Sequence, residues 1–199
     1  MAFGVKIGER LTTSDGIPYM WQSYNTDSPT SVMEITDGHV SGADRFGSSI
    51  AVGTSKIVVG ARLADPNGSN SGSVYIYNID GTGKIEIDAS DGAASAEFGT
   101  SVAIDEKSGK IVVGAPGHTG GGRAYIYNLD GTGEVILDHF ELQTGDQFGY
   151  CVGINNNKVY VSAAQYQHNN EDEGAMFMFN TDGTNKKFVL SPYGVSSYA

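Results

Sequence analysis

Cysteine, tryptophan and basic residues are scarce in this sequence. Its 199 residues include one Cys and one Trp, and 12 Lys and Arg stand against 23 Asp and Glu. A single cysteine excludes a disulfide within the chain. The net charge of −11 at pH 7 disfavours binding to nucleic acid or to an anionic membrane surface, because like charges repel.

Long hydrophobic runs are also lacking. No stretch approaches the ~20 consecutive apolar residues that a membrane-spanning helix needs, and residues 1–10 lack the apolar segment of a secretory signal peptide. We therefore expect neither membrane insertion nor a signal peptide. Glycine, in contrast, is abundant, and 28 glycines with 39% hydrophobic residues are typical of a turn-rich all-β protein.

The chain repeats itself. Phe-Gly pairs begin at positions 46, 98 and 148, which are 52 and 50 residues apart, and each pair opens a unit of similar sequence. In the middle unit four strand-like runs are expected at 99–104, 110–115, 123–128 and 134–138. Four short strands in a unit of this period are typical of one blade of a β-propeller.

The composition of the runs indicates which strands are buried. Ile111–Ala115 is apolar throughout, which predicts a strand covered on both faces. In the first unit, Lys84, Glu86 and Asp88 alternate with two isoleucines, which predicts an edge strand with one solvent-exposed face. Small residues recur at Gly60, Gly114 and Ser162, where a close approach of backbones is expected.

Two other features allow a structural or a chemical interpretation. The Asp-Gly turns contain aspartates at 80, 130 and 182, which could bind calcium or another ligand but are better explained as shaping tight hairpins. Cys151 takes the place of Ser49 and Ser101, so we expect a small buried thiol rather than a catalytic one. The four histidines hold no equivalent repeat positions, and we predict no catalytic site, metal or cofactor.

Phe98-Gly99 followed by Gly114-Ala115-Pro116 resembles the FG-GAP repeat, which occurs in the propeller heads of integrin α subunits and in bacterial and phage proteins. The resemblance extends over residues 44–190. The sequence of residues 72–99 is similar to FG-GAP repeat arrays in structural proteins of marine bacteriophages. The first and third copies have Gly60-Ala61-Arg62 and Ser162-Ala163-Ala164 in place of Gly-Ala-Pro. The D-x-D-x-D-G calcium loop of the family has no counterpart here, so calcium binding is not carried over.

The predicted fold class is all-β, a β-propeller of four-stranded blades with about four repeats. Residues 44–199 form the FG-GAP repeats, with blades at about 46–90, 98–138 and 148–190. Residues 1–43 are a degenerate first blade or an N-terminal docking arm. Tyr193-Gly194 resembles the Phe-Gly opening, so 193–198 is expected to close the incomplete blade, or to exchange into another subunit.

The loops between the second and third runs differ among the copies and should share one rim. They are either solvated connectors or a contact surface on a rigid frame. The candidate binding-loop residues are Asp65, Asn67, Asn70, His118, Tyr166, His168, Glu171, Asp172 and Glu173.

The resemblance implies a non-enzymatic structural or adhesion component of a phage virion, in the tail, fibre, collar or capsid decoration. Its expected partners are other virion proteins, a host-surface glycan or protein, or both, and it is expected as a homo-oligomer or in multiple copies on the extracellular particle. The alternatives are a cell-surface adhesion module of a cellular protein and, less favoured, a propeller hydrolase or lyase.

Overall fold

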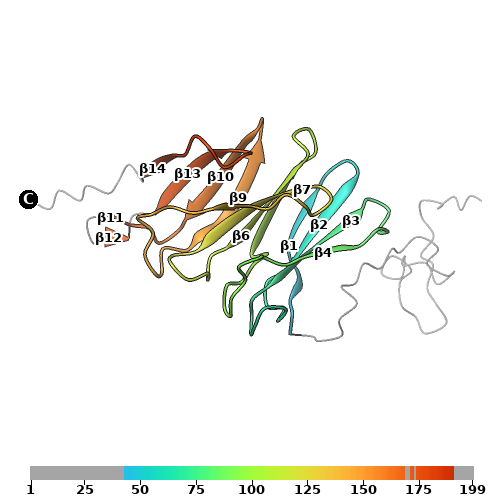
Figure 1. Cartoon of the computed structure of the whole chain (residues 1–199), viewed down its shortest axis with the longest axis horizontal. Coiled ribbons are helices and arrows are strands. Elements are labelled where there is room, and N and C mark those ends of the chain that lie inside the picture. Colours follow the sequence, from blue (N-terminus) through green and yellow to red (C-terminus); the bar gives the residue numbers. More distant parts are fainter. Residues whose placement is uncertain (1–42, 169–170, 173, 191–199) are drawn as a thin grey trace, which may run out of the picture. The chain divides into compact units, whose positions relative to one another are not determined.

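The computed structural model describes residues 43–168, 171–172 and 174–190 (Figure 1). These residues all belong to one compact unit of the chain. The predicted N-terminal blade or arm, up to residue 42, and the predicted closing strand at 193–198 lie outside the described residues.

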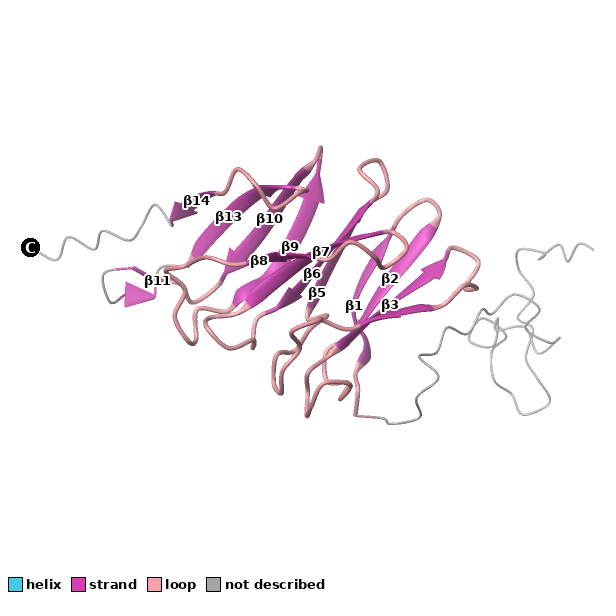
Figure 2. Cartoon of the chain, viewed as in Figure 1, coloured by secondary structure: helices cyan, strands magenta, loops and turns pink. Residues whose placement is uncertain are grey.

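The described chain forms three four-stranded antiparallel sheets, which we call blades 1, 2 and 3 (Figure 2). Blade 1 consists of β1 (Phe46–Val52), β2 (Lys56–Ala61), β3 (Ser73–Asn78) and β4 (Ile85–Ile87). Blade 2 consists of β5 (Ser101–Asp105), β6 (Lys110–Ala115), β7 (Arg123–Asn128) and β8 (Val135–Leu137). Blade 3 consists of β9 (Phe148–Asn155), β10 (Lys158–Ala163), β13 (Ala175–Asn180) and β14 (Lys187–Leu190).

Each blade is a meander in which neighbouring strands pair antiparallel, with a tight turn between the first and second strands and a longer loop between the second and third. A two-stranded ladder of β11 (Gln167–His168) and β12 (Glu171–Asp172) lies in the loop of blade 3 between β10 and β13. The prediction of an all-β fold with four-stranded blades is confirmed. In the middle unit the observed strands begin and end within two residues of the expected ones.

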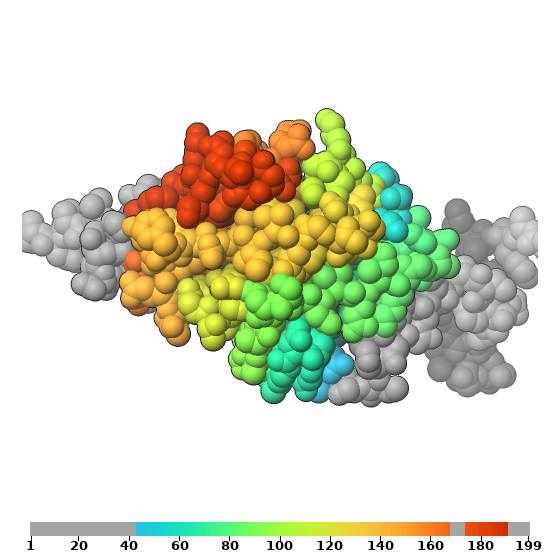
Figure 3. Space-filling view, viewed as in Figure 1, coloured from blue at the N-terminus to red at the C-terminus, as the bar shows by residue number. Residues whose placement is uncertain are grey.

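Among the described residues, two of the three hydrophobic clusters lie between blades, and the third, which includes Tyr75 and Tyr77, belongs to blade 1 alone. Val58 and Ile76 of blade 1 pack in one cluster with Ile111 and Tyr125 of blade 2. A second cluster joins blades 2 and 3 and includes the buried Phe177. The space-filling view shows atoms of successive blades in contact along one face (Figure 3). The second strand of blade 2, β6, is therefore covered on both sides, which explains its unbroken apolar run.

The Phe-Gly corner is the point at which one blade docks on the preceding one. The Phe98 ring is buried and meets Tyr125 edge to face at 5.2 Å, while Ser49 Oγ of blade 1 donates to the carbonyl oxygen of Gly99 at 2.7 Å. A Cβ added at Gly60 would overlap that same carbonyl oxygen. Glycine is required at position 60 because backbone meets backbone there.

The third copy differs at this point. Ser162 replaces the glycine, and its Oγ accepts the N–H of Cys151 at 2.9 Å. Cys151 is exposed, so the prediction of a buried thiol was wrong. In blade 1 the next Phe-Gly corner lies over the equivalent Ser49, whereas no such corner follows blade 3 within the part of the chain that the structure describes.

The aspartates of the Asp-Gly turns act within the turns. Asp80 Oδ1 accepts the backbone N–H of Thr82 at 3.0 Å and the Thr82 hydroxyl at 2.7 Å. The same two bonds recur at Asp130 and Thr132 and at Asp182 and Thr184. The threonine hydroxyl and N–H hold the pKa of each carboxyl below its usual value. The turn-shaping interpretation is confirmed.

Glu106 joins the β5–β6 turn of blade 2 to the β1–β2 turn of blade 1. Its carboxylate accepts the backbone N–H groups of Thr54, Ser55 and Lys56 at 2.8, 2.7 and 2.9 Å, and both neighbouring hydroxyls donate to it as well. The hydroxyl of Thr54 and the N–H of Ser55 lower the pKa of Glu106 to about 2.

Acid should therefore weaken the contact between blades 1 and 2. The pKa of Glu106 is about 2 in the folded state against an ordinary 4.5, so its stabilising effect is complete above about pH 4.5 and is lost as the pH falls towards 2. We expect Glu106→Gln to lower the melting temperature at pH 7. The difference from the parent chain should narrow steadily as the pH falls to about 3, as followed by thermal unfolding.

The matched control for this series is Asp44→Asn, which removes the same charge from a residue outside the Glu106 contact. Its effect on the melting temperature should not follow the same pH profile. An equal loss for Glu106→Gln at every pH would contradict the assigned role of the carboxylate.

Candidate functional site

A groove of about 490 Å³ lies where the Phe-Gly corners of the three blades meet, and we call it the rim groove. It is lined by Ser48, Arg62, Glu97, Thr100, Pro116, Gly117, Gln147 and Tyr150. Its volume falls within the range of small-molecule sites. The groove exists because the corners dock closely enough to bring three blades together at one rim.

The lining residues come from equivalent positions of the repeat. Ser48, Thr100 and Tyr150 each stand two residues after the phenylalanine of a Phe-Gly pair. Arg62 and Pro116 each follow a Gly-Ala pair. The fold thus presents one repeat position three times, and the residue after Gly-Ala twice, around one groove, and the side chains at these positions differ from blade to blade.

The backbone is left-handed at the residue before each Phe-Gly pair. The φ angles are 55° at Arg45, 53° at Glu97 and 58° at Gln147, and few residues other than glycine adopt this conformation. At Glu97 the turn is held by Thr100, whose N–H and hydroxyl donate to the Glu97 carbonyl oxygen at 3.1 and 2.7 Å. Two of these residues, Glu97 and Gln147, line the rim groove, and residues in this conformation are candidates for function.

Three side chains give the rim groove its chemical character. Arg62 Nη1 pairs with Glu97 Oε2 at 2.6 Å, and the two side chains remain 30% and 34% exposed, so both can still meet a ligand. Tyr150 is 53% exposed and presents an aromatic ring. A charged donor, a charged acceptor and an aromatic ring therefore line one groove.

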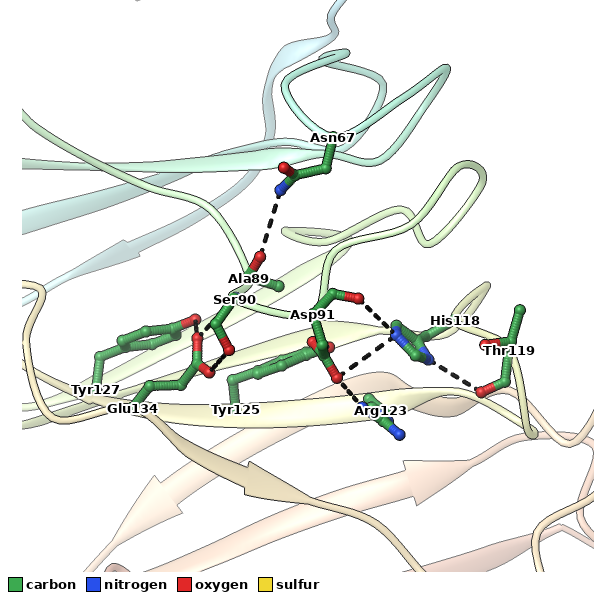
Figure 4. A network of polar contacts seen from close by, with 10 residues as sticks. All are labelled: Asn67, Ala89, Ser90, Asp91, His118, Thr119, Arg123, Tyr125, Tyr127 and Glu134. Atoms are coloured by element: carbon green, nitrogen blue, oxygen red, sulfur yellow. Dashed lines mark hydrogen bonds and ion pairs between the residues drawn. The ribbon is translucent and has the colours of Figure 1, made fainter.

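A second polar cluster surrounds Asp91, in the linker between β4 and β5 (Figure 4). The Tyr125 hydroxyl donates to Asp91 Oδ1 at 2.7 Å, and Arg123 pairs with Oδ2. His118 Nε2 lies 3.2 Å from the Asp91 carbonyl oxygen, and its Nδ1 lies 2.9 Å from that of Thr119. These contacts fasten the linker to blade 2, which is a structural role.

The same linker is held again one residue earlier. Glu134 accepts the N–H of Ser90 at 3.1 Å, the Ser90 hydroxyl and the Tyr127 hydroxyl at 2.6 Å (Figure 4). Burial raises the pKa of Tyr127 and of Tyr125, so both phenols stay neutral and act as hydrogen-bond donors.

Two of the predicted binding residues are buried. His118 is 7% exposed and Tyr166 is 2% exposed, and both occupy the repeat position held by Ala64 in blade 1. The Tyr166 hydroxyl donates to Glu141 at 3.1 Å. Side chains that are enclosed and bonded in this way offer no surface to a ligand, which corrects their assignment to a contact surface.

Those of the other predicted residues that the structure describes lie in two separate loops, β2–β3 and β10–β13. Asp65 Oδ1 accepts the N–H of Asn70 at 2.6 Å, and Asn67 Nδ2 donates to the carbonyl oxygen of Ala89 at 3.3 Å, so this loop is bonded internally and to the linker. His168 lies in β11, Glu171 and Asp172 lie in β12, and Glu173 is outside the described residues.

The sequence prediction missed the rim groove, although it placed the variable loops on one rim. The signal that could have found it is variation at equivalent positions next to the Phe-Gly and Gly-Ala motifs. Among residues 43–168, 171–172 and 174–190, no cluster of three or more His, Cys, Asp or Glu side chains could hold a metal. The same residues include no helix long and apolar enough to span a membrane.

Three meander blades that pack face to face through their Phe-Gly corners define a β-propeller-like domain. The FG-GAP repeat family matches residues 29–77 and 84–127. These residues of the chain are therefore similar to the FG-GAP repeat, and the described part has a β-propeller-like fold. Among curated proteins no sequence is similar to this chain.

Solved structures resemble the fold. The β-propeller domain of the Trilobed protease from Pyrococcus furiosus, with an open velcro topology, superposes with a TM-score of 0.51 and 11% identity over 73% of this chain and 42% of that chain. Two neuraminidase-like proteins, one from A/bat/Guatemala/164/2009 and one of subtype N10 from A/little yellow-shouldered bat/Guatemala/060/2010, each give a TM-score of 0.43. They are 18% and 19% identical over 71% of this chain and 37% and 42% of theirs. This chain spans less than half the length of each.

Proposed function

We propose that this chain is a non-catalytic binding module that contacts its partner through the rim groove. The observation that carries the proposal is the groove itself, in which Tyr150, Arg62 and Glu97 remain partly exposed on a rigid frame. Recognition groups on loops held by a rigid scaffold are typical of binding sites.

The frame is rigid because adjacent blades share backbone contacts as well as a core. Gly60 and Gly114 each admit the carbonyl oxygen of the next blade's corner, and the linker after blade 1 is bonded to blade 2 through Ser90 and Asp91. A rigid site loses little entropy on binding. Several copies on one assembly would raise weak contacts to useful avidity.

We further propose that the assembly is a phage particle, in which this chain is a structural or adhesion component at the tail, fibre, collar or capsid surface. The similarity of residues 72–99 to arrays in structural proteins of marine bacteriophages supports this role. Partners would be other virion proteins and a glycan or protein on the host surface. The alternative is a cell-surface adhesion module of a cellular protein.

Mass spectrometry of purified particles distinguishes these two roles. We expect the chain among the virion proteins, in a copy number comparable to other surface components. The control is the surface fraction of uninfected cells, where the chain should not be found. Its presence on cells and absence from every particle preparation would favour the cellular module and contradict the phage role.

A further inference from the structure

We infer that the rim groove binds a neutral saccharide of one or two rings. This inference rests on the proposed function, since it names the ligand class of the same groove. It is carried by the combination of an exposed ring, a paired donor and acceptor, and a ring of hydroxyl and amide groups in a groove of about 490 Å³.

Tyr150 supplies an apolar surface. More than half of the side chain, 53%, is exposed, although aromatic residues on strands usually pack against a neighbour. A pyranose ring has an apolar face of C–H groups, which can stack on an aromatic ring, and polar edges that remain free for hydrogen bonds. An aromatic side chain with a polar end suits such an amphipathic ligand.

Arg62 and Glu97 supply a donor and an acceptor side by side. Their ion pair holds the guanidinium and the carboxylate 2.6 Å apart. Two vicinal hydroxyl groups of a sugar can donate to the carboxylate and accept from the guanidinium at the same time, because each hydroxyl is both a donor and an acceptor. Gln147, also in the lining, offers one further donor and acceptor.

The charge of the site favours a neutral ligand over an acidic one. The positive charge of Arg62 is balanced by Glu97 at 2.6 Å, and the chain as a whole carries a net charge of −11. An acidic saccharide would therefore meet an unfavourable potential without an unpaired cation to receive it in the rim groove. Ser48 and Thr100 add neutral hydroxyl groups to the lining.

The test uses the full chain on an array of immobilised neutral and acidic oligosaccharides, followed by titration with free disaccharides under NMR observation. We expect binding to neutral saccharides, and at least a tenfold weaker affinity for Tyr150→Ala and for Glu97→Gln. Tyr150→Phe keeps the ring and should retain most of the affinity. Phe140→Ala is the matched control, since Phe140 is 85% exposed and is not part of the groove lining.

Melting temperatures close to that of the parent chain will show that the variants fold. If Glu97→Gln does not fold, the affinity of Tyr150→Ala alone decides the test. The inference is overturned if the chain binds no neutral saccharide, or if Tyr150→Ala binds as well as the parent chain. An equal loss in Phe140→Ala would also overturn it. The proposed phage role is tested independently of saccharide binding, by mass spectrometry of purified particles.

Discussion

Gly114→Ala is expected to destabilise the folded chain by about 3 kcal/mol or more. The backbone of Gly114 is not left-handed, so the cost is one of space: the added Cβ would overlap the carbonyl oxygen of Gly149 at the corner of blade 3. Both groups belong to the backbone and cannot rotate away. Thermal unfolding should show a melting temperature lower by roughly 6–12 °C for a domain of this size.

Gly153→Ala is the matched control for this substitution. Gly153 lies in β9, has no left-handed backbone, and a Cβ added there would meet no atom within 4 Å. Its substitution should be neutral or stabilise by about 0.4–1 kcal/mol, because alanine restricts the unfolded chain. Equal stabilities for Gly114→Ala and Gly153→Ala would contradict the backbone contact between blades.

Phe148→Ala is the second substitution with a large expected effect, about 3–5 kcal/mol. The Phe148 side chain is fully buried and meets Phe177 and Phe179 edge to face at 5.2 and 6.2 Å. Its backbone N–H donates to the carbonyl oxygen of Gly121 in blade 2 at 2.8 Å. Removal of the ring leaves a cavity at the contact between blades 2 and 3, where rigid strands cannot collapse to fill it.

Phe140→Ala provides the comparison. This residue lies in the linker after β8 and is 85% exposed, with Lys186 Nζ 5.5 Å from the centre of its ring. Loss of an exposed ring, with its cation–π contact and its stacking on His139 at 4.8 Å, should cost about 1 kcal/mol. Chemical denaturation of both variants measures the difference. Similar losses would show that the Phe-Gly corner does not carry the contact between blades.

The two contacts between blades use equivalent positions with different chemistry. After blade 1, Ser90 of the linker bonds to Glu134, which stands just before the last strand of blade 2. After blade 2, the equivalent linker residue is Phe140, and it meets Lys186 just before the last strand of blade 3. A repeat can therefore keep its geometry while a hydrogen-bonded pair is replaced by an aromatic and cationic one.

Much of the fold was predictable because its determinants are local. Turn residues such as Asp80 accept a hydrogen bond from the backbone two positions away. The repeat of about 50 residues is visible in the sequence because each blade is stable only when a neighbouring blade covers its apolar faces. The unbroken apolar run at Ile111–Ala115 predicted coverage on both sides, and the two core clusters provide it.

The candidate site was not predictable in the same way. His118 and Tyr166 looked like loop residues, but the turn after β6 and after β10 directs this position inwards, where Ala64 is buried in the first copy. Cys151 looked like a buried residue, and its exposure depends on what lies over blade 3 rather than on its own neighbours in sequence. Both depend on contacts between segments far apart in the chain.

By itself the sequence determined the strands, the turns, the repeat and the need for glycine at Gly60 and Gly114, because each follows from backbone conformation or from the pattern of one unit. Only the tertiary structure decided that Arg62, Glu97 and Tyr150 line one groove. These residues belong to three separate units, and the close docking of Phe-Gly corners brings them together. The physical reason is that burial between blades, and not any local preference, fixes the distance from one corner to the next.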